Sequence, residues 1–147
     1  MKIIFNSEKK KIIKKLNEQF GIEKIPQLLI RFGKEKIRAY SGNLSTEELN
    51  ELDKILRIET AGLYIAKQQN DGIRLTIDGV QLFKKQISKN ILEINEKQKQ
   101  EWLKGYDLEI KTNNSFKIIK YKDNFLGCGK STGEKITNFI PKERRIK

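Results

Sequence analysis

Residues 125–145 read FLGCGKSTGEKITNFIPKERR, and the segment GCGKST at 127–132 ends like a phosphate-binding loop. Such a loop needs its first glycine at position 124, where this chain has Asn124, and a helix directly after the lysine. Gly133 stands where the first turn of that helix would form, and the residues after it alternate like a strand. We therefore reject an ATPase, and interpret GCG as closely packed strand backbone and STGE as a hairpin turn.

Short candidate strands surround this segment at regular spacing. They cover residues 106–110, 115–121, 124–129 and 135–140, and the turn-forming stretches TNN, KDN and STGE separate them. Upstream, Asp78 and Gly79 begin a short helix that runs to residue 87, residues 90–94 form a strand, and residues 96–105 form a polar helix. Short strands joined by tight turns are typical of a small β-barrel or sandwich.

The first half of the chain alternates helices and strands. Ser7 is expected to cap a helix that ends with Phe20 and Gly21, and strands are expected at 27–32, 37–42 and 61–68. The capping box STEE at 45–48 begins another helix. Its inward side chains are Leu49, Leu52, Ile55 and Leu56. A turn signal at 70–72 then places a domain boundary near residue 70.

The sequence thus predicts an α+β fold with two domains. Residues 1–70 form an α+β domain and residues 71–147 form a second domain, a small β-barrel or sandwich.

The chain is strongly basic, with 31 Lys and Arg against 19 Asp and Glu, a net charge of +12. Residues 111–147 carry 10 basic and 3 acidic side chains, whereas residues 71–110 carry 7 of each. This uneven distribution of positive charge favours a polyanionic partner such as RNA. The lysines between residues 9 and 15 are interpreted as the solvated face of a helix, with nucleic-acid contact as the alternative.

Cysteine and histidine usage limits the possible chemistry. A single cysteine excludes an internal disulfide, and the absence of histidine excludes a Cys/His zinc site and a histidine general base. No signal peptide and no apolar run of membrane-spanning length are apparent. We expect a soluble cytoplasmic protein that does not contact a membrane.

Candidate catalytic side chains do not form a set. Cys128 has no histidine to activate it and is interpreted as a buried structural thiol. Trp102 is interpreted as a core anchor, with stacking on RNA as the alternative. No paired carboxylates stand out, so we predict no catalytic residues, no metal and no cofactor.

The order of elements from residue 71, with WLKGYDLEI, FLGCGKST and NFIPKERRI, resembles a PUA domain, an RNA-binding module. The closer resemblance is to small archaeal proteins that join a short α+β domain to a PUA domain. These are similar to C-terminal regions of Nol/Nop/Sun-family RNA cytosine-5 methyltransferases, and in domain order to Nip-type ribosome-biogenesis factors. The segment RFGKEKIRAYSG at 31–42 extends the resemblance into the first half.

The resemblance implies an RNA-binding surface made by the first helix of the PUA domain and nearby strands. On this chain the helix and its exit supply Gln81, Lys84, Lys85 and Lys89, the hairpin supplies Lys130, Ser131, Thr132 and Lys135, and a tail strand supplies Lys142, Arg144 and Arg145. For the two arginines, surface charge that maintains solubility is the alternative.

Methyltransferases of that family carry a Rossmann domain and cysteines next to proline, and this sequence has neither a G-x-G-x-x-G fingerprint nor a Pro-Cys pair. We therefore predict a non-catalytic protein that binds tRNA or rRNA in RNA modification or ribosome biogenesis. The alternative is an accessory subunit that docks an RNA methyltransferase, and a ribosome-assembly factor is another candidate partner.

Overall fold

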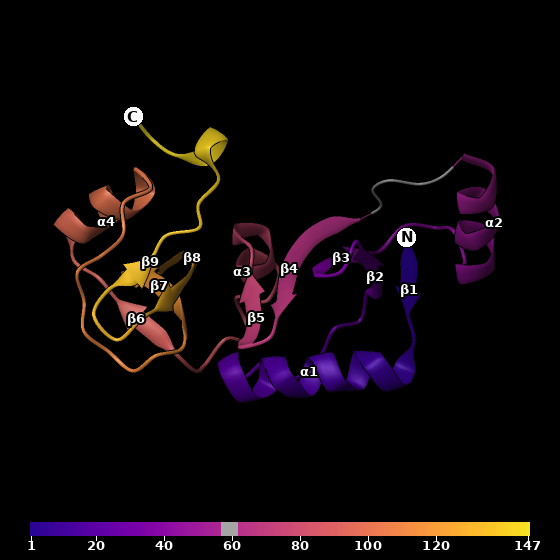
Figure 1. Cartoon of the computed structure of the whole chain (residues 1–147), viewed down its shortest axis with the longest axis horizontal. Helices are drawn as coiled ribbons and strands as arrows, with labels where there is room; N and C mark the ends of the chain where they lie inside the picture. Colours follow the sequence, from indigo (N-terminus) through magenta and orange to yellow (C-terminus); the bar gives the residue numbers. More distant parts are fainter. Residues whose placement is uncertain (57–61) are drawn as a thin grey trace.

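The computed structural model describes residues 1–56 and 62–147 and contains two sheets, with helix α1 running along the first (Figure 1). This arrangement confirms the predicted α+β class. The first sheet is antiparallel, with the strand order β1-β2-β3-β4-β5. Its strands are β1 (Lys2–Ile4), β2 (Leu28–Phe32), β3 (Lys36–Tyr40), β4 (Leu63–Gln69) and β5 (Gly72–Leu75).

Helix α1 (Asn6–Phe20) buries Ile12, Leu16 and Phe20 against one face of this sheet. Gly21 ends the helix as predicted, with a left-handed φ of 82° that suits glycine. The predicted cap at Ser7 is wrong, because Phe5 occupies the N-cap position and no side chain caps the helix.

Helix α2 (Thr46–Leu56) lies at the end of the sheet beside β1 (Figure 1). Its predicted capping box is confirmed by the reciprocal bonds of Ser45 and Glu48, each 3.1 Å long. Leu49 is buried as predicted, whereas Ile55 is 77% exposed and does not face inward. The side chain of Leu56 and Ala61, the first residue of a predicted strand, lie outside the described residues.

The second sheet has the order β6-β7-β8-β9, with β6 and β7 parallel and the other pairs antiparallel. Helix α4 (Glu96–Leu103) begins with a capping box formed by Asn95 and Gln98. The strands are β6 (Ile91–Glu93), β7 (Phe116–Tyr121), β8 (Asn124–Ser131) and β9 (Ile136–Thr137).

Two predicted strands of this half are wrong. Residues 106–110 form only an isolated bridge between Leu108 and Ile136. The tail after Pro141 forms a single 3₁₀ turn, η1 (Lys142–Arg144), in which Arg144 N–H donates to the carbonyl of Pro141 at 2.9 Å. Proline has no N–H to give to a strand ladder, which favours the turn.

Gly127, Cys128 and Gly129 lie in β8, which confirms the interpretation of GCG as strand backbone, and β8 extends through Ser131. A Cβ on Gly129 would stand 2.6 Å from Ile136 and 2.8 Å from Trp102, so only glycine fits there. Thr132 N–H donates to Lys135 O at 2.9 Å, which confirms the predicted hairpin turn.

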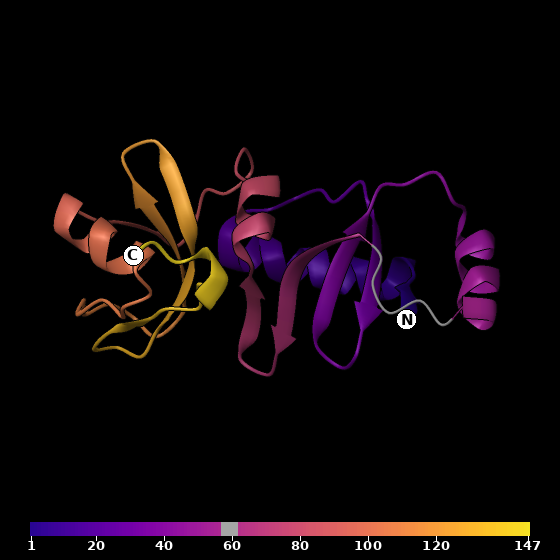
Figure 2. The same cartoon turned by 90° about the horizontal axis from the view of Figure 1, so that it is seen from above.

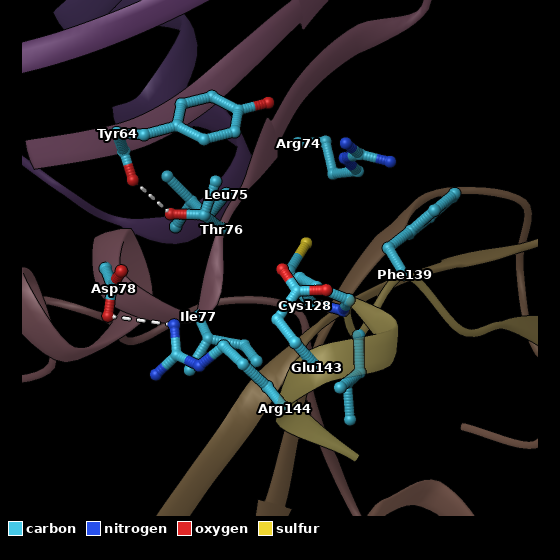
Figure 3. Close-up of a pocket in the computed structure, with 12 residues that line it drawn as sticks. Tyr64, Arg74, Leu75, Thr76, Ile77, Asp78, Cys128, Phe139, Glu143 and Arg144 are labelled. Carbon is cyan, nitrogen blue, oxygen red and sulfur yellow. Dashed lines mark hydrogen bonds and ion pairs between the residues drawn. The ribbon is translucent and has the colours of Figure 1, made fainter. Parts of the chain in front are cut away.

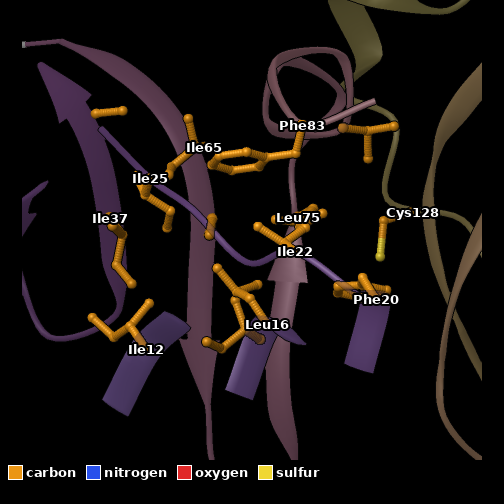
Figure 4. Close-up of a cluster of buried hydrophobic side chains, with 14 of the residues drawn as sticks. Ile12, Leu16, Phe20, Ile22, Ile25, Ile37, Ile65, Leu75, Phe83 and Cys128 are labelled. Atoms are coloured by element: carbon orange, nitrogen blue, oxygen red, sulfur yellow. The ribbon is translucent and has the colours of Figure 1, made fainter. Parts of the chain in front are cut away.

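One hydrophobic core connects the two sheets (Figure 4). Phe20 and Leu75 from the first half belong to the same buried cluster as Phe83, Phe116 and Cys128 from the second. Strand β5 lies beyond residue 70 yet pairs with β4 in the first sheet. The boundary near residue 70 therefore stays a prediction about how the chain divides.

In the two described ranges, no helix combines the length and the apolar character needed to cross a membrane.

Candidate nucleic-acid interface

Helix α3 (Ile77–Leu82) is held against the first sheet by close backbone contact. Thr76 caps it, because its Oγ1 accepts a hydrogen bond from Gly79 N–H at 3.0 Å and donates to Tyr64 O at 2.7 Å. A Cβ on Gly79 would overlap the carbonyl oxygen of Ile65 on β4. The helix ends five residues before the predicted position 87, and Ser88 N–H instead donates to Phe20 O at 2.8 Å.

A concavity of about 390 Å³, here called the α3 groove, lies between the end of α3 and the β7–β8 turn. The predicted residues Gln81, Lys84 and Lys85 lie together on one wall, and all three are exposed. Lys120 from β7 faces them, and Gln81 Nε2 donates to Phe125 O at 2.8 Å across the groove. The remaining lining residues are Asp123, Asn124 and Phe125.

A second cavity of about 230 Å³, the C-terminal pocket, lies between the first sheet, the start of α3 and the chain end (Figure 3). Arg74 Cζ stands 4.3 Å from the ring centroid of Phe139 on one side. On another side, Arg144 Nη1 lies 3.1 Å from Asp78 Oδ1. Tyr64 and Glu143 also line the pocket, so it combines aromatic rings, cations and carboxylates.

The predicted residues do not form a single face. Lys130 lies over the ring of Phe116 at 4.8 Å, and its Nζ is 3.3 Å from Asp71. Asp71 precedes β5 and Asp78, the partner of Arg144, follows it. At about 3.3 Å per strand residue, β5 extends over roughly 13 Å, so the aspartate partners of the two cations lie at opposite ends of this strand.

Other predicted residues lie elsewhere. Ser131 was predicted to contact RNA, but its side chain is fully buried. Its Oγ donates to Thr112 O at 3.1 Å. Lys89 Nζ donates to Asn17 O at the end of α1, and Lys135 Nζ lies 3.2 Å from Asp107. The remaining predicted residues are exposed: Thr132 lies in the β8–β9 turn, and Lys142 and Arg145 lie in the tail.

Sequence reasoning missed Lys120, Arg74 and Phe139. Arg74 had a signal, since it stands between Ile73 and Leu75, which both point into the core, so strand alternation directs it outward. Lys120 and Phe139 had no local signal, because the pairing of distant segments places them.

The buried titratable groups have structural roles. Lys117 donates to the side-chain oxygens of Asn113 at 2.7 Å and Asn90 at 3.2 Å, and burial lowers its pKa.

Trp102 is fully buried and donates to Leu126 O at 2.9 Å, which confirms its prediction as a core anchor. Across residues 1–56 and 62–147, no group of three or more carboxylates or thiols is placed to hold a metal ion.

Cys128 is confirmed as a buried thiol. Burial raises its pKa from an ordinary 9.0 to about 12, because the thiolate would lose its hydration. We expect a thiol reagent at pH 8 to modify the folded protein about 1000-fold more slowly than the urea-unfolded chain, since three pKa units remove that much thiolate. Absorbance of the released thiol product measures both rates, and similar rates would contradict an inert thiol.

Comparison with known proteins identifies a family match in the C-terminal part of the chain. The family described as "Methyltransferase RsmF PUA domain" matches residues 89–146, a range that begins after α3 and includes every element from β6 to η1. These residues form a PUA domain.

Two curated relatives extend the likeness. The chain is 29% identical over 107 residues to "Ribosomal RNA small subunit methyltransferase F" of Psychromonas ingrahamii (strain DSM 17664 / CCUG 51855 / 37), covering 68% of this chain. It is 26% identical over 90 residues to the protein of the same name from Aeromonas salmonicida (strain A449), covering 60% of this chain. The aligned regions span only 22% and 19% of those relatives, about a fifth of their length.

The chain thus contains a PUA domain and is similar to part of these RNA methyltransferases. The archaeal origin and the likeness to Nip-type factors stay predictions. The match begins at residue 89, so α3 precedes it, whereas Lys120 and the tail lie inside the PUA domain.

Proposed function

We propose that this chain binds structured RNA without catalysing a reaction, and that it serves the modification of ribosomal RNA. One observation carries the proposal: the α3 groove gathers Lys84, Lys85 and Lys120 around a concavity with a single carboxylate, that of Asp123. The groove lies where the PUA domain begins. The relatives that match this part of the chain are named as ribosomal RNA methyltransferases.

The groove suits a phosphate backbone more than a small molecule. Lys84 and Lys85 are exposed, and Lys120 is half-buried with its Nζ 3.9 Å from Glu93, so the exposed pair in particular can neutralise phosphates and release counterions. A-form RNA is recognised mainly by shape and by contacts to phosphates and 2′-hydroxyls. Gln81 adds an amide beside the lysines, which can bind a ribose hydroxyl or a phosphate oxygen.

The non-catalytic role is supported by the chemistry of the described residues. The only thiol is buried with a raised pKa, and the sequence has no histidine. A catalytic partner would then perform any methyl transfer.

Replacing Lys84 and Lys85 with glutamine tests the proposed groove. We expect weaker binding to RNA hairpins of several sequences, and a plot of log affinity against log salt that is shallower by about two units, one for each lost phosphate contact. Fluorescence anisotropy over a series of salt concentrations measures both.

The control removes equal charge from the exposed face of α1, as in Lys10→Gln with Lys14→Gln. We expect little change in its salt slope. Equal effects of the two double variants would mean diffuse attraction and would overturn the groove as an RNA site. Sequencing of RNA recovered with the protein then distinguishes ribosomal RNA from tRNA.

A further inference from the structure

The face of the first sheet opposite α1 is only partly covered: Leu49 of α2 packs with Ile3 and Ile30 over β1 and β2, and Phe32 lies against that cluster. Figure 2 shows α1 behind the sheet, while β3, β4 and β5 present their other face to the viewer. The cluster that packs under α1 contains Ile37, Ala66 and Ile73, so Lys36, Lys67 and Arg74 point the opposite way, while the irregular register between Ile37 and Arg38 leaves Ile65 in the same buried cluster.

The register lines up basic and aromatic side chains on this face. Phe32 pairs with Lys36, Lys36 with Lys67, and Lys67 with Arg74, which makes one row across four strands. Tyr64 pairs with Arg38 in the next row. Directly opposed residues share a face of a sheet. We call these six residues the sheet platform: Phe32, Lys36, Arg38, Tyr64, Lys67 and Arg74.

Cations lie close to the two rings of the sheet platform. Arg38 Cζ lies 5.7 Å from the ring centroids of both Phe32 and Tyr64, and Lys36 Nζ lies 5.5 Å from that of Tyr64. One carboxylate, that of Glu35, lies beside these cations, 3.4 Å from Lys67 Nζ. Four basic side chains against this one carboxylate give the platform a positive charge that is complementary to phosphates.

The C-terminal pocket continues the sheet platform. Tyr64 and Arg74 belong to both, and Figure 3 shows the Arg74 side chain between Tyr64 and Phe139. The pocket's volume of about 230 Å³ is enough for one nucleobase, with Phe139 and Arg74 for stacking and Asp78 and Glu143 as hydrogen-bond acceptors.

We propose that the sheet platform, together with the C-terminal pocket, binds a single-stranded RNA segment through base stacking. This inference rests on the proposed function and deepens it, because the single strand would adjoin a stem held in the α3 groove. The bases stack on the rings and on the guanidinium planes of Arg38 and Arg74, while Lys36 and Lys67 neutralise phosphates.

The spacing of the rings selects single strands over duplex. Neighbouring strands lie about 4.8 Å apart, so Phe32 on β2 and Tyr64 on β4 stand roughly 10 Å apart. Stacked bases in a helix follow each other at about 3.4 Å and hide their faces from a protein. Only an unpaired segment with splayed bases can reach both rings.

Tyr64→Leu tests the stacking, because leucine keeps an apolar side chain and removes the ring. We expect the affinity for a single-stranded RNA of ten nucleotides to fall about tenfold, and the affinity for a blunt hairpin to stay within twofold. Tyr64→Phe keeps the ring and should bind both RNAs like the unmodified protein. Thermal unfolding followed by circular dichroism shows whether each variant is folded.

Charge reversal provides a second test that leaves the packing intact. Lys36→Glu on the exposed edge of the platform should weaken single-strand binding at least fivefold, whereas Lys11→Glu on the exposed face of α1 should change it less than twofold. Unchanged single-strand affinity in Tyr64→Leu, or equal losses from Lys36→Glu and Lys11→Glu, would overturn the inference. Hairpin binding without single-strand binding would refute only this inference, and binding of neither RNA would refute the proposed function as well.

Discussion

Replacing Trp102 with alanine is expected to lower the free energy of unfolding by about 4 kcal/mol. The indole is fully buried, and it anchors the cluster that fills the PUA domain together with Leu108, Ile119 and Ile136. Its removal leaves a large cavity and also leaves the carbonyl of Leu126 without the bond that Trp102 Nε1 donates at 2.9 Å. The packing of this buried cluster therefore depends on the Trp102 side chain.

Urea unfolding followed by far-ultraviolet circular dichroism measures this loss, since the variant removes the only tryptophan and with it the fluorescence signal. Trp102→Phe serves as the control, because it keeps part of the ring volume and should cost less than the alanine variant. A loss below 1 kcal/mol for Trp102→Ala would show that the barrel does not depend on the indole.

Features set by neighbouring residues were predictable from the sequence. The apolar spacing of Ile12, Leu16 and Phe20 and the stop at Gly21 define α1 within a single segment. The capping box of Ser45 and Glu48 likewise needs only four consecutive residues. For GCGKST, Asn124 and Gly133 were sufficient to reject a phosphate-binding loop, and the strand β8 agrees.

Features set by distant pairing were not predictable. Residues 106–110 have the composition of a strand, but only Leu108 finds a bridge partner, in Ile136. Strand β1 is three residues long, too short to give a periodic signal, and its pairing with β2 defines it. Ser131 follows a lysine in an apparently polar turn, yet the fold buries it under Thr112.

The candidate site was predicted in part for the same reason. Gln81, Lys84 and Lys85 lie on one helix and its exit, so their proximity follows from local structure. Lys130 and Arg144 come from distant segments, and their ion-pair partners Asp71 and Asp78 lie on either side of β5. A resemblance can name such residues, but it does not say which of them meet.

Gly79→Ala is expected to lower the free energy of unfolding by about 3 kcal/mol and to weaken RNA binding in the α3 groove. The new methyl group would overlap the carbonyl oxygen of Ile65 and lie 3.0 Å from its carbonyl carbon. These are backbone atoms of β4, which β3 and β5 hold on both sides, so α3 must move instead. That movement displaces Gln81, which follows Gly79 on the same short helix.

Gly33→Ala separates steric overlap from backbone strain. Gly33 has a φ of +66° and open space where a Cβ would lie, so alanine there should cost about 1 kcal/mol from its left-handed conformation alone. Gly79 has no positive φ, so any loss beyond that of an ordinary Gly→Ala change comes from contact with β4. Urea unfolding and hairpin binding are measured on both variants. If Gly79→Ala proves no more costly than Gly33→Ala and binds hairpin RNA normally, close approach to β4 does not fix α3, and the groove must owe its shape to the Gln81–Phe125 bond.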